Sequence, residues 1–314
     1  MTTNSHQHNT PIKIGTRDSE LALWQANKVK QALEDLGYAT ALISVKSEGD
    51  LNLEQPLYEM GITGIFTKTL DIAMLTGKVD IAVHSMKDVP TALPKGIVKG
   101  AVLQRASYRD LLLHKGVSFL DNNNATIATG SLRRKAQWLH KYPTHTVENL
   151  RGNVNTRLQK LESNDWSGAI FAEAGLERIN LKPENATALD WMLPAPAQGA
   201  MLVVALEKDH WIREALAKLN HADTELCVHI ERQFLKVLEG GCTAPIGALA
   251  TINGDDIHFE GNLVSLDGKE KLTVKKVVSR KDAKTLGERC AQELLQNGGQ
   301  ELMQYIKEVT QNLK

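Results

Sequence analysis

Apolar positions in the first hundred residues follow two alternating spacings. Short segments rich in Ile, Val and other apolar residues, typical of strands, occur at 12–16, 41–46 and 80–84. Between these segments, apolar residues recur with the period of a helix from Ser19 onward and again around 66–75. Strand, helix, strand, helix, strand is the order typical of a parallel sheet with helices on its faces. The first helix is predicted to bury Leu21, Trp24, Val29, Leu33 and Leu36.

The same alternation repeats in a second unit that begins near Gln104. Strands are predicted at 125–129, 144–150 and 169–172, each followed by a helical pattern. A strongly apolar strand at 201–206 then follows a complete second unit, and it is best placed in the first sheet. Two units joined by two chain crossings form a hinge with a cleft, the arrangement of solute-binding proteins that close on a ligand.

The pattern changes from Asp223 onward. A long amphipathic helix leads to Leu238, and it is followed by strands at 247–252, 257–265 and 272–279 and by helices at 282–296 and 300–313. We therefore predict an α/β protein with two periplasmic-binding-protein-like (type II) domains joined by a hinge, and a C-terminal α+β domain with a three-stranded antiparallel sheet. The predicted bounds are 11–103 plus 198–220 for domain 1, 104–197 for domain 2 and 223–314 for domain 3, after a disordered tail over 1–10.

Composition restricts the class of partner. The chain has 314 residues, and its 37 Lys and Arg residues equal its 37 Asp and Glu residues, so no overall field recruits nucleic acid or an anionic membrane. The segment 1–10 is polar without an apolar core of a signal peptide, and no run approaches the roughly 18 apolar residues of a membrane span. We expect a cytoplasmic enzyme or binding protein whose charged site is local.

The three cysteines, Cys227, Cys242 and Cys290, have no spacing of a disulfide framework or a zinc site, so we expect reduced thiols and no metal. Cys242 is distinctive because it lies on the glycine-rich turn that ends the long helix before Pro245. The local pattern alone favours a buried cysteine after a helix cap. The other interpretation is a thiol that faces the cleft.

Arginine follows three successive predicted strands of the second unit. Helix N-termini offer N–H groups and a positive dipole to anions, and a guanidinium binds a carboxylate through two parallel hydrogen bonds. A solvated surface would instead scatter its basic charge among lysines on exposed helix faces. The pattern therefore favours an anion site formed by Arg133, Arg134, Arg151, Arg157 and Arg178.

The predicted cleft thus combines these arginines with Lys87, Asp88 and the thiol of Cys242. In this combination the chain resembles the porphobilinogen deaminase family. The segments that match the family pattern extend from about residue 12 to the end of the chain: Thr16–Ser19, Leu21–Ala26, His84–Pro90, Arg109–Asp110, Thr129–Arg134, Leu150–Arg157, Ala174–Arg178, Gln198–Ala200 and Leu238–Gly247.

The resemblance implies that four porphobilinogen molecules are joined head to tail into linear hydroxymethylbilane, with release of ammonia. It also implies a dipyrromethane cofactor held by a thioether to Cys242. Asp88 is implied to carry the catalysis: a carboxylate beside the pyrrole N–H stabilises positive charge as the amine leaves, and it can move the protons of each step. The alternative for Asp88 is a helix cap or an ion pair with Lys87.

The resemblance further implies a set of substrate and cofactor contacts: Arg17, Ser19, Lys87, Thr129, Ser131, Arg133, Arg134, Arg151, Arg157, Arg178 and Gln198. Asp50 and Lys68 match the lid of the family. The implied protein is a monomer that passes its product to uroporphyrinogen-III synthase.

Two positions depart from the family pattern: Thr63 stands where a lid lysine is common, and Ala197 stands where glycine is usual. A two-domain anion-binding protein or a ligand-sensing module without catalysis is the alternative function, because it would share the cleft. No secretory signal or helix-turn-helix precedes Ile12, as a transport protein or a regulator would require. Nucleic-acid binding is a third hypothesis, and it has less support because the arginines lack interleaved aromatic residues.

Overall fold

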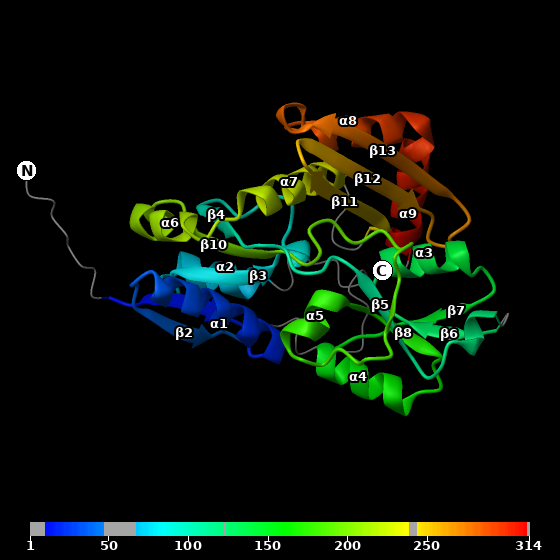
Figure 1. Ribbon diagram of the computed structural model, residues 1–314, viewed down its shortest axis with the longest axis horizontal. Helices are drawn as coiled ribbons and strands as arrows, with labels where there is room; N and C mark the ends of the chain where they lie inside the picture. Colours follow the sequence, from blue (N-terminus) through cyan, green and yellow to red (C-terminus); the bar gives the residue numbers. More distant parts are fainter. Residues whose placement is uncertain (1–9, 47–66, 122–123, 239–243, 313–314) are drawn as a thin grey trace, which may run out of the picture.

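The computed structural model describes residues 10–46, 67–121, 124–238 and 244–312, which form three groups of strands and helices (Figure 1). Within these residues there are two five-stranded sheets with helices on both faces and one three-stranded antiparallel sheet near the C-terminus. This confirms the predicted α/β fold with a C-terminal antiparallel sheet. The predicted tail lies outside the described residues except for Thr10.

The first sheet has the strand order β2-β1-β3-β10-β4 within the described chain. Strands β1, β2 and β3 are parallel, and β10 runs antiparallel to both β3 and β4. The late strand β10 therefore does return to the first sheet, as its apolar pattern predicts. The bounds are β1 (Ile12–Thr16), β2 (Thr40–Ser44), β3 (Ile81–Ser85), β4 (Ile97–Val102) and β10 (Met201–Leu206).

Helices cover both faces of this sheet because its strands are apolar on both sides. On one face, Val29 and Leu33 of α1 (Glu20–Asp35) pack with residues of α6 (His210–Ala217). On the other face, α2 (Lys68–Leu75) shares a core with Val228 from the long helix α7 (Ala222–Val237). The prediction for α1 was wrong at two positions: Trp24 is 36% exposed and Leu36 is 45% exposed.

The second sheet repeats this plan with the order β7-β6-β8-β5-β9, in which β6, β7 and β8 are parallel and β5 is antiparallel to its neighbours. Helices α4 and α5 cover one face, and α3 covers the other through the fully buried Trp138. The bounds are β5 (Asp110–His114), β6 (Thr126–Ala128), α3 (Leu132–Lys141), β7 (Thr146–Glu148), α4 (Val154–Ser163), β8 (Gly168–Ala172), α5 (Glu173–Arg178) and β9 (Thr187–Ala188).

The third group packs α7, α8 (Leu286–Leu294) and α9 (Gln300–Asn312) on one antiparallel sheet. Its strands are β11 (Ile246–Asn253), β12 (Asp256–Val264) and β13 (Lys271–Ser279). Cys227 and Cys290 are free and buried there, and burial raises the pKa of each thiol to about 11.

The chain crosses between the two sheets twice, first between β4 and β5 and again between β9 and β10. A buried ion pair ties the third group to both crossings. Glu231 of α7 is fully buried and accepts hydrogen bonds from Arg105 in the first crossing, with N···O distances of 2.6 and 3.1 Å. It also accepts from the backbone N–H of Ala197 in the second crossing (2.7 Å) and of Ala250 in β11 (2.8 Å). Ala197 has a φ of 64°, in the left-handed region where glycine is favoured. This explains why glycine is usual at this position, and the alanine of this chain adopts the same conformation at a cost in backbone strain.

Candidate active site

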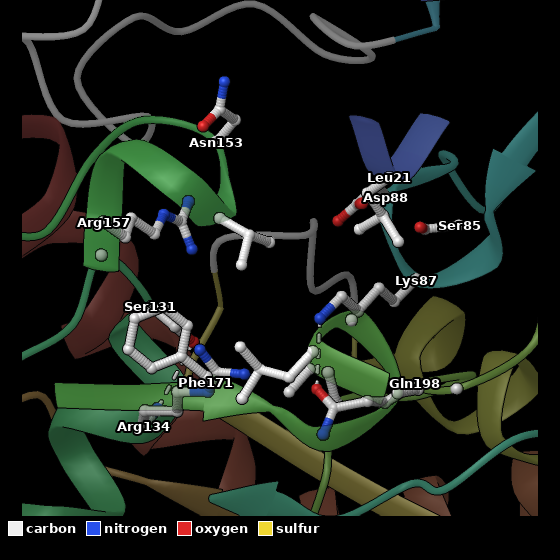
Figure 2. A pocket seen from close by; sticks show the side chains of 18 of the residues that line it. Leu21, Ser85, Lys87, Asp88, Ser131, Arg134, Asn153, Arg157, Phe171 and Gln198 are labelled. Atoms are coloured by element: carbon white, nitrogen blue, oxygen red, sulfur yellow. Dashed lines mark hydrogen bonds between the residues drawn. The ribbon is translucent and has the colours of Figure 1, made fainter. Parts of the chain in front are cut away.

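A cavity of about 280 Å³ lies where the carboxyl ends of the parallel strands of both sheets meet. One wall comes from the first sheet and the other from the second, as Figure 2 shows, and Gln198 of the second crossing lies at its base. Ligands of open parallel sheets bind at this end because helix N-termini and loops converge there. The residues that follow each strand, rather than the strands themselves, therefore form the site.

Three helices begin at the cavity. Ser19, Ser131 and Asn153 cap α1, α3 and α4 by accepting hydrogen bonds from N–H groups of the first turn. All three capping residues line the cavity. The positive ends of three helix dipoles therefore point into one space, which favours an anion.

All five arginines predicted for the anion site line this cavity, but two of them are also bound to a buried carboxylate. Asp110 at the start of β5 is fully buried; Arg133 donates to it at 2.8 Å, and Arg134 donates to it at 2.7 and 3.0 Å. Arg133 and Arg134 also donate to the carbonyls of Leu193 and Ile170, both at 2.8 Å. Although burial alone would raise the pKa of Asp110, these two arginines hold it well below its usual range.

Gln198 extends this network across the cavity. Its side-chain amide donates to Asp110 (3.0 Å) and to the carbonyl of Tyr108 (2.8 Å), and its oxygen accepts from the ammonium of Lys87 at 3.3 Å. Burial lowers the pKa of Lys87 to about 8, against the attraction of Asp88. Lys87 is therefore a cation near neutral pH whose charge is easily lost at higher pH.

Three further arginines complete the second-sheet wall. Arg157 donates to the carbonyl of Gly152 (2.8 Å), and burial, reinforced by repulsion from Arg134, lowers its pKa to about 10. Burial also lowers the pKa of Arg151 below its ordinary value and that of Arg178 to about 10. Positive charges held in a dry wall bind anions more strongly than charges in water.

Arg178 also joins the two walls. It donates to the carbonyl of Gly199 at 2.7 Å, and its guanidinium lies 5.7 Å from the ring centroid of Trp24 on α1. Trp24 is therefore partly exposed because it faces α5 of the other unit rather than its own sheet. Gly199 has a φ of 86°, and a Cβ there would lie 2.5 Å from the carbonyl of Ser107, so this crossing requires glycine.

Asp88 projects from the short 3₁₀ turn Met86–Asp88 that follows β3. It is half-buried, and it makes no hydrogen bond or ion pair with the described residues, although Lys87 and Arg157 lie close enough to attract it. Figure 2 shows Asp88 and Lys87 on one side of the cavity and Arg157 and Arg134 on the other. A carboxylate in this position is available to a ligand, because no ion pair with the described chain occupies it.

Some predicted site residues lie elsewhere. Thr129 is buried behind the wall, where its hydroxyl accepts from the N–H of Ser131 at 3.2 Å, and Lys68 is exposed at the start of α2, away from the cavity. Asp50, Thr63 and Cys242 lie outside the described residues. Asp110 was not predicted as a site residue, although its burial at the head of an apolar strand, next to Arg109, could have indicated a buried charge that needs partners.

No group of three or more histidine, cysteine, aspartate or glutamate residues in the described part of the chain could hold a metal ion. None of the helices in the described ranges is long and apolar enough to cross a membrane.

Comparison with known proteins agrees with this site. Residues 12–214 match the family model described as porphobilinogen deaminase, dipyromethane cofactor binding domain, and residues 225–296 match the C-terminal domain of the same family. The chain belongs to the porphobilinogen deaminase family. The family resemblance drawn from the sequence motifs is thereby confirmed.

Relatives of the family align over nearly the whole chain. Porphobilinogen deaminase of Moorella thermoacetica is 41% identical over 302 residues, which cover 94% of this chain and 96% of the relative. That of Chloroherpeton thalassium is 42% identical over 282 residues, covering 88% and 89%. Among solved structures, a periplasmic substrate-binding protein of an ABC transporter from Coxiella burnetii is 15% identical, with a TM-score of 0.42, over 70% of this chain and 96% of that one.

Proposed function

We propose that this chain is a transferase, a hydroxymethylbilane synthase that condenses four porphobilinogen molecules head to tail into linear hydroxymethylbilane with release of ammonia. The observation that carries the proposal is a cavity that Asp88 and the five arginines line together, with Asp88 opposite Arg134 and Arg157 in Figure 2, in a chain of this family. An anion-binding protein would use the arginines, but it would have no use for an unpaired carboxylate among them.

The arginine wall suits the substrate because porphobilinogen has an acetate and a propionate arm. Each added ring brings two more carboxylates, so the demand for cationic partners grows along the product. Arg151, Arg157 and Arg178 line the cavity, and three helix N-termini add partial positive charge. We assign carboxylate binding to these groups together with Arg17, Ser19 and Lys87.

Asp88 is assigned the catalytic role. As the amine of porphobilinogen departs, positive charge develops on the pyrrole ring, and a carboxylate held within hydrogen-bonding reach of the ring N–H stabilises that charge. The same carboxyl group can protonate the departing amine and later accept the proton released when the new carbon–carbon bond forms. One site with one aspartate suits a step that is repeated four times.

The cavity residues also fit a cofactor that carries several carboxylates. Within the described chain, Nε of Arg133 is buried at the cavity wall without a hydrogen-bond partner, and the N-termini of α3 and α4 border the same space. We propose that dipyrromethane, attached by a thioether to Cys242, is held by Arg133, Arg151 and Arg157. When bound, it supplies the pyrrole carbon to which the first substrate molecule is joined.

The proposal also includes a monomer located in the cytoplasm, with uroporphyrinogen-III synthase as the enzyme that receives the product. Family membership supports this part of the proposal. The transfer of the product is further supported by its chemistry, since hydroxymethylbilane is a reactive open-chain compound that needs prompt conversion.

The test combines mass spectrometry with a turnover assay. We expect the purified protein to exceed its sequence mass by one dipyrromethane, to colour with a pyrrole aldehyde reagent, and to lose both properties in Cys242→Ser. We also expect it to consume porphobilinogen and release one ammonia for each molecule consumed. A protein of bare sequence mass from cells that make porphobilinogen, with tight substrate binding but no ammonia release, would instead support the anion-binding function.

A further inference from the structure

The turn that presents Asp88 is short and has few hydrogen bonds of its own. It contains a single 3₁₀ turn, in which the N–H of Val89 donates to the carbonyl of Met86 at 3.2 Å, and Pro90 follows immediately. Pro90 has no N–H, and a short 3₁₀ turn leaves carbonyl groups without partners at its end. The position of the Asp88 carboxylate therefore depends on contacts from outside the turn.

Arg232 of α7 supplies three of those contacts, beside the hydrogen bond that the N–H of Met86 donates to the carbonyl of Ala200 at 3.0 Å. Its guanidinium donates to three carbonyl groups in and just after the turn, at 3.2 Å to that of Met86, 2.9 Å to that of Val89 and 2.5 Å to that of Pro90. Arg232 is half-buried and lies more than 140 residues from the turn in sequence. The planar guanidinium can bind several carbonyls in one arrangement, so it holds the orientation of the turn as well as its distance.

The helix that carries Arg232 is itself held in place on both sides. Val228 packs in the same core cluster as Met86 and Val89, beneath the turn. Ile230 and Phe234 are fully buried in the core of the third group. Glu231, next to Arg232, is fixed by its ion pair with Arg105. Arg232 thus connects a short turn to a helix that is packed in two hydrophobic cores, those of the first sheet and of the third group.

We propose that Arg232 is the positioning residue of the Asp88 turn, through which the third group of elements sets the place of the carboxylate in the cavity. The expected effect of Arg232 on turnover rests on the proposed function, whereas its expected effect on the conformation of the turn does not. The same helix leads, through Leu238, to the segment that contains Cys242.

The test compares Arg232→Ala and Arg232→Lys with the matched control Arg280→Ala. Arg280 also binds α7, through Asp223, but this ion pair is exposed and does not touch the turn. Hydrogen–deuterium exchange of peptides covering 81–89 measures the turn, and steady-state kinetics of the cofactor-loaded proteins measures turnover. Thermal unfolding of each variant shows whether the fold is retained.

We expect Arg232→Ala to accelerate exchange at Val89 about tenfold and to lower kcat by about 10- to 100-fold with KM within about threefold, since a misplacement on the order of 1 Å costs up to about 100-fold. Arg232→Lys should restore part of kcat, and Arg280→Ala should change neither measurement. Unchanged exchange at Val89, or a raised KM with unchanged kcat, would overturn the proposal. If Arg232→Ala does not fold, Arg232→Lys decides by the same two criteria.

The exchange measurement separates this inference from the proposed function. A wild-type protein that does not turn over porphobilinogen refutes the function, whereas the exchange of the turn still decides whether Arg232 positions it.

Discussion

The two walls of the cavity are built in opposite ways. The second-sheet wall carries Arg133 and Arg134 in the first turn of α3 and binds both to the buried Asp110, so these charges are rigid before any ligand arrives. The first-sheet wall presents Asp88 on a short turn that is held by Arg232 from a distant helix. Under the proposed function, the arginine wall binds many carboxylates and benefits from fixed charge, whereas Asp88 takes part in several proton transfers and has to remain unpaired.

Asp110 explains how so much positive charge is kept in a dry wall. Burying two guanidinium groups without a partner would cost several kcal/mol, on the order of the whole stability margin of a protein. One buried carboxylate offsets this cost and leaves a net positive charge. The second-sheet wall is thus stabilised by an internal anion, and the turn of the first-sheet wall by hydrogen bonds to its backbone carbonyls. Substitutions in the two walls should therefore differ in their effects on stability and on activity.

The largest effect on activity is expected for Asp88→Asn. The amide cannot stabilise a developing cation or transfer protons, so we expect kcat to fall by about 100- to 10,000-fold. Because Asp88 makes no ion pair with the described chain, the unfolding temperature should stay within about 2 °C of wild type. Porphobilinogen consumption and circular dichroism melting check both parts, and near-normal turnover would refute the assigned role.

The largest effect on stability is expected for Asp110→Asn. It leaves Arg133 and Arg134 as uncompensated buried cations, so the free energy of unfolding should fall by about 3–5 kcal/mol. Asp190→Asn is the control, since Asp190 is 73% exposed and pairs with Arg109 at 3.4 Å, and such pairs contribute about 1 kcal/mol or less. Urea unfolding measures both. Equal losses would mean that Asp110 does not stabilise the wall.

A smaller effect is expected from pH through Lys87. Its pKa of about 8 means that the ammonium is mostly charged below this pH and mostly neutral above it, so kcat/KM should fall by about 30-fold as pH rises from 7 to 9.5. Lys87→Arg keeps its charge over this range and should flatten the profile. A wild-type profile without an inflection between pH 7.5 and about 8.5 would contradict this role.

The sign of the stability change follows from the same pKa. Because the folded pKa of Lys87 lies below the ordinary value of 10.5, the unfolded chain binds the proton more tightly between about pH 8 and 10.5. The contribution of Lys87 to the free energy of unfolding should therefore increase with pH across that window, while substrate binding weakens.

The smallest effect is expected for Trp24→Leu, which removes the contact with Arg178 between the walls. Cation–π pairs at partly exposed sites contribute about 0.5–1 kcal/mol, so KM should rise by about two- to fivefold. Tyr38→Leu removes a comparable pair with Lys218 away from the cavity and should leave KM unchanged. An equal change of KM in both variants would show that the contact between the walls has no specific role.

Much of the fold was predictable because its signals are local. Alternating helical and strand spacing placed most helices and strands of both units, and the apolar run of β10 indicated its return to the first sheet. Strands β4 and β5 were missed because Lys99 and Gly100 interrupt one and the other begins with a charged residue. The helical spacing of α1 also misplaced Trp24, because a periodic pattern does not tell whether an apolar side chain faces its own sheet or a neighbouring unit.

The residues of the candidate site also differ in whether local sequence could predict them. The sequence alone determined the family, the arginines that follow successive strands and the aspartate of the Lys87–Asp88 pair, because residue types at the carboxyl ends of strands are visible in the chain order. Only the tertiary structure decided that Asp110 binds two of those arginines and that Arg232 holds the Asp88 turn. Both contacts join residues more than 20 positions apart, and their energy depends on burial and hydrogen-bond geometry, which exist only once the three groups of elements pack together.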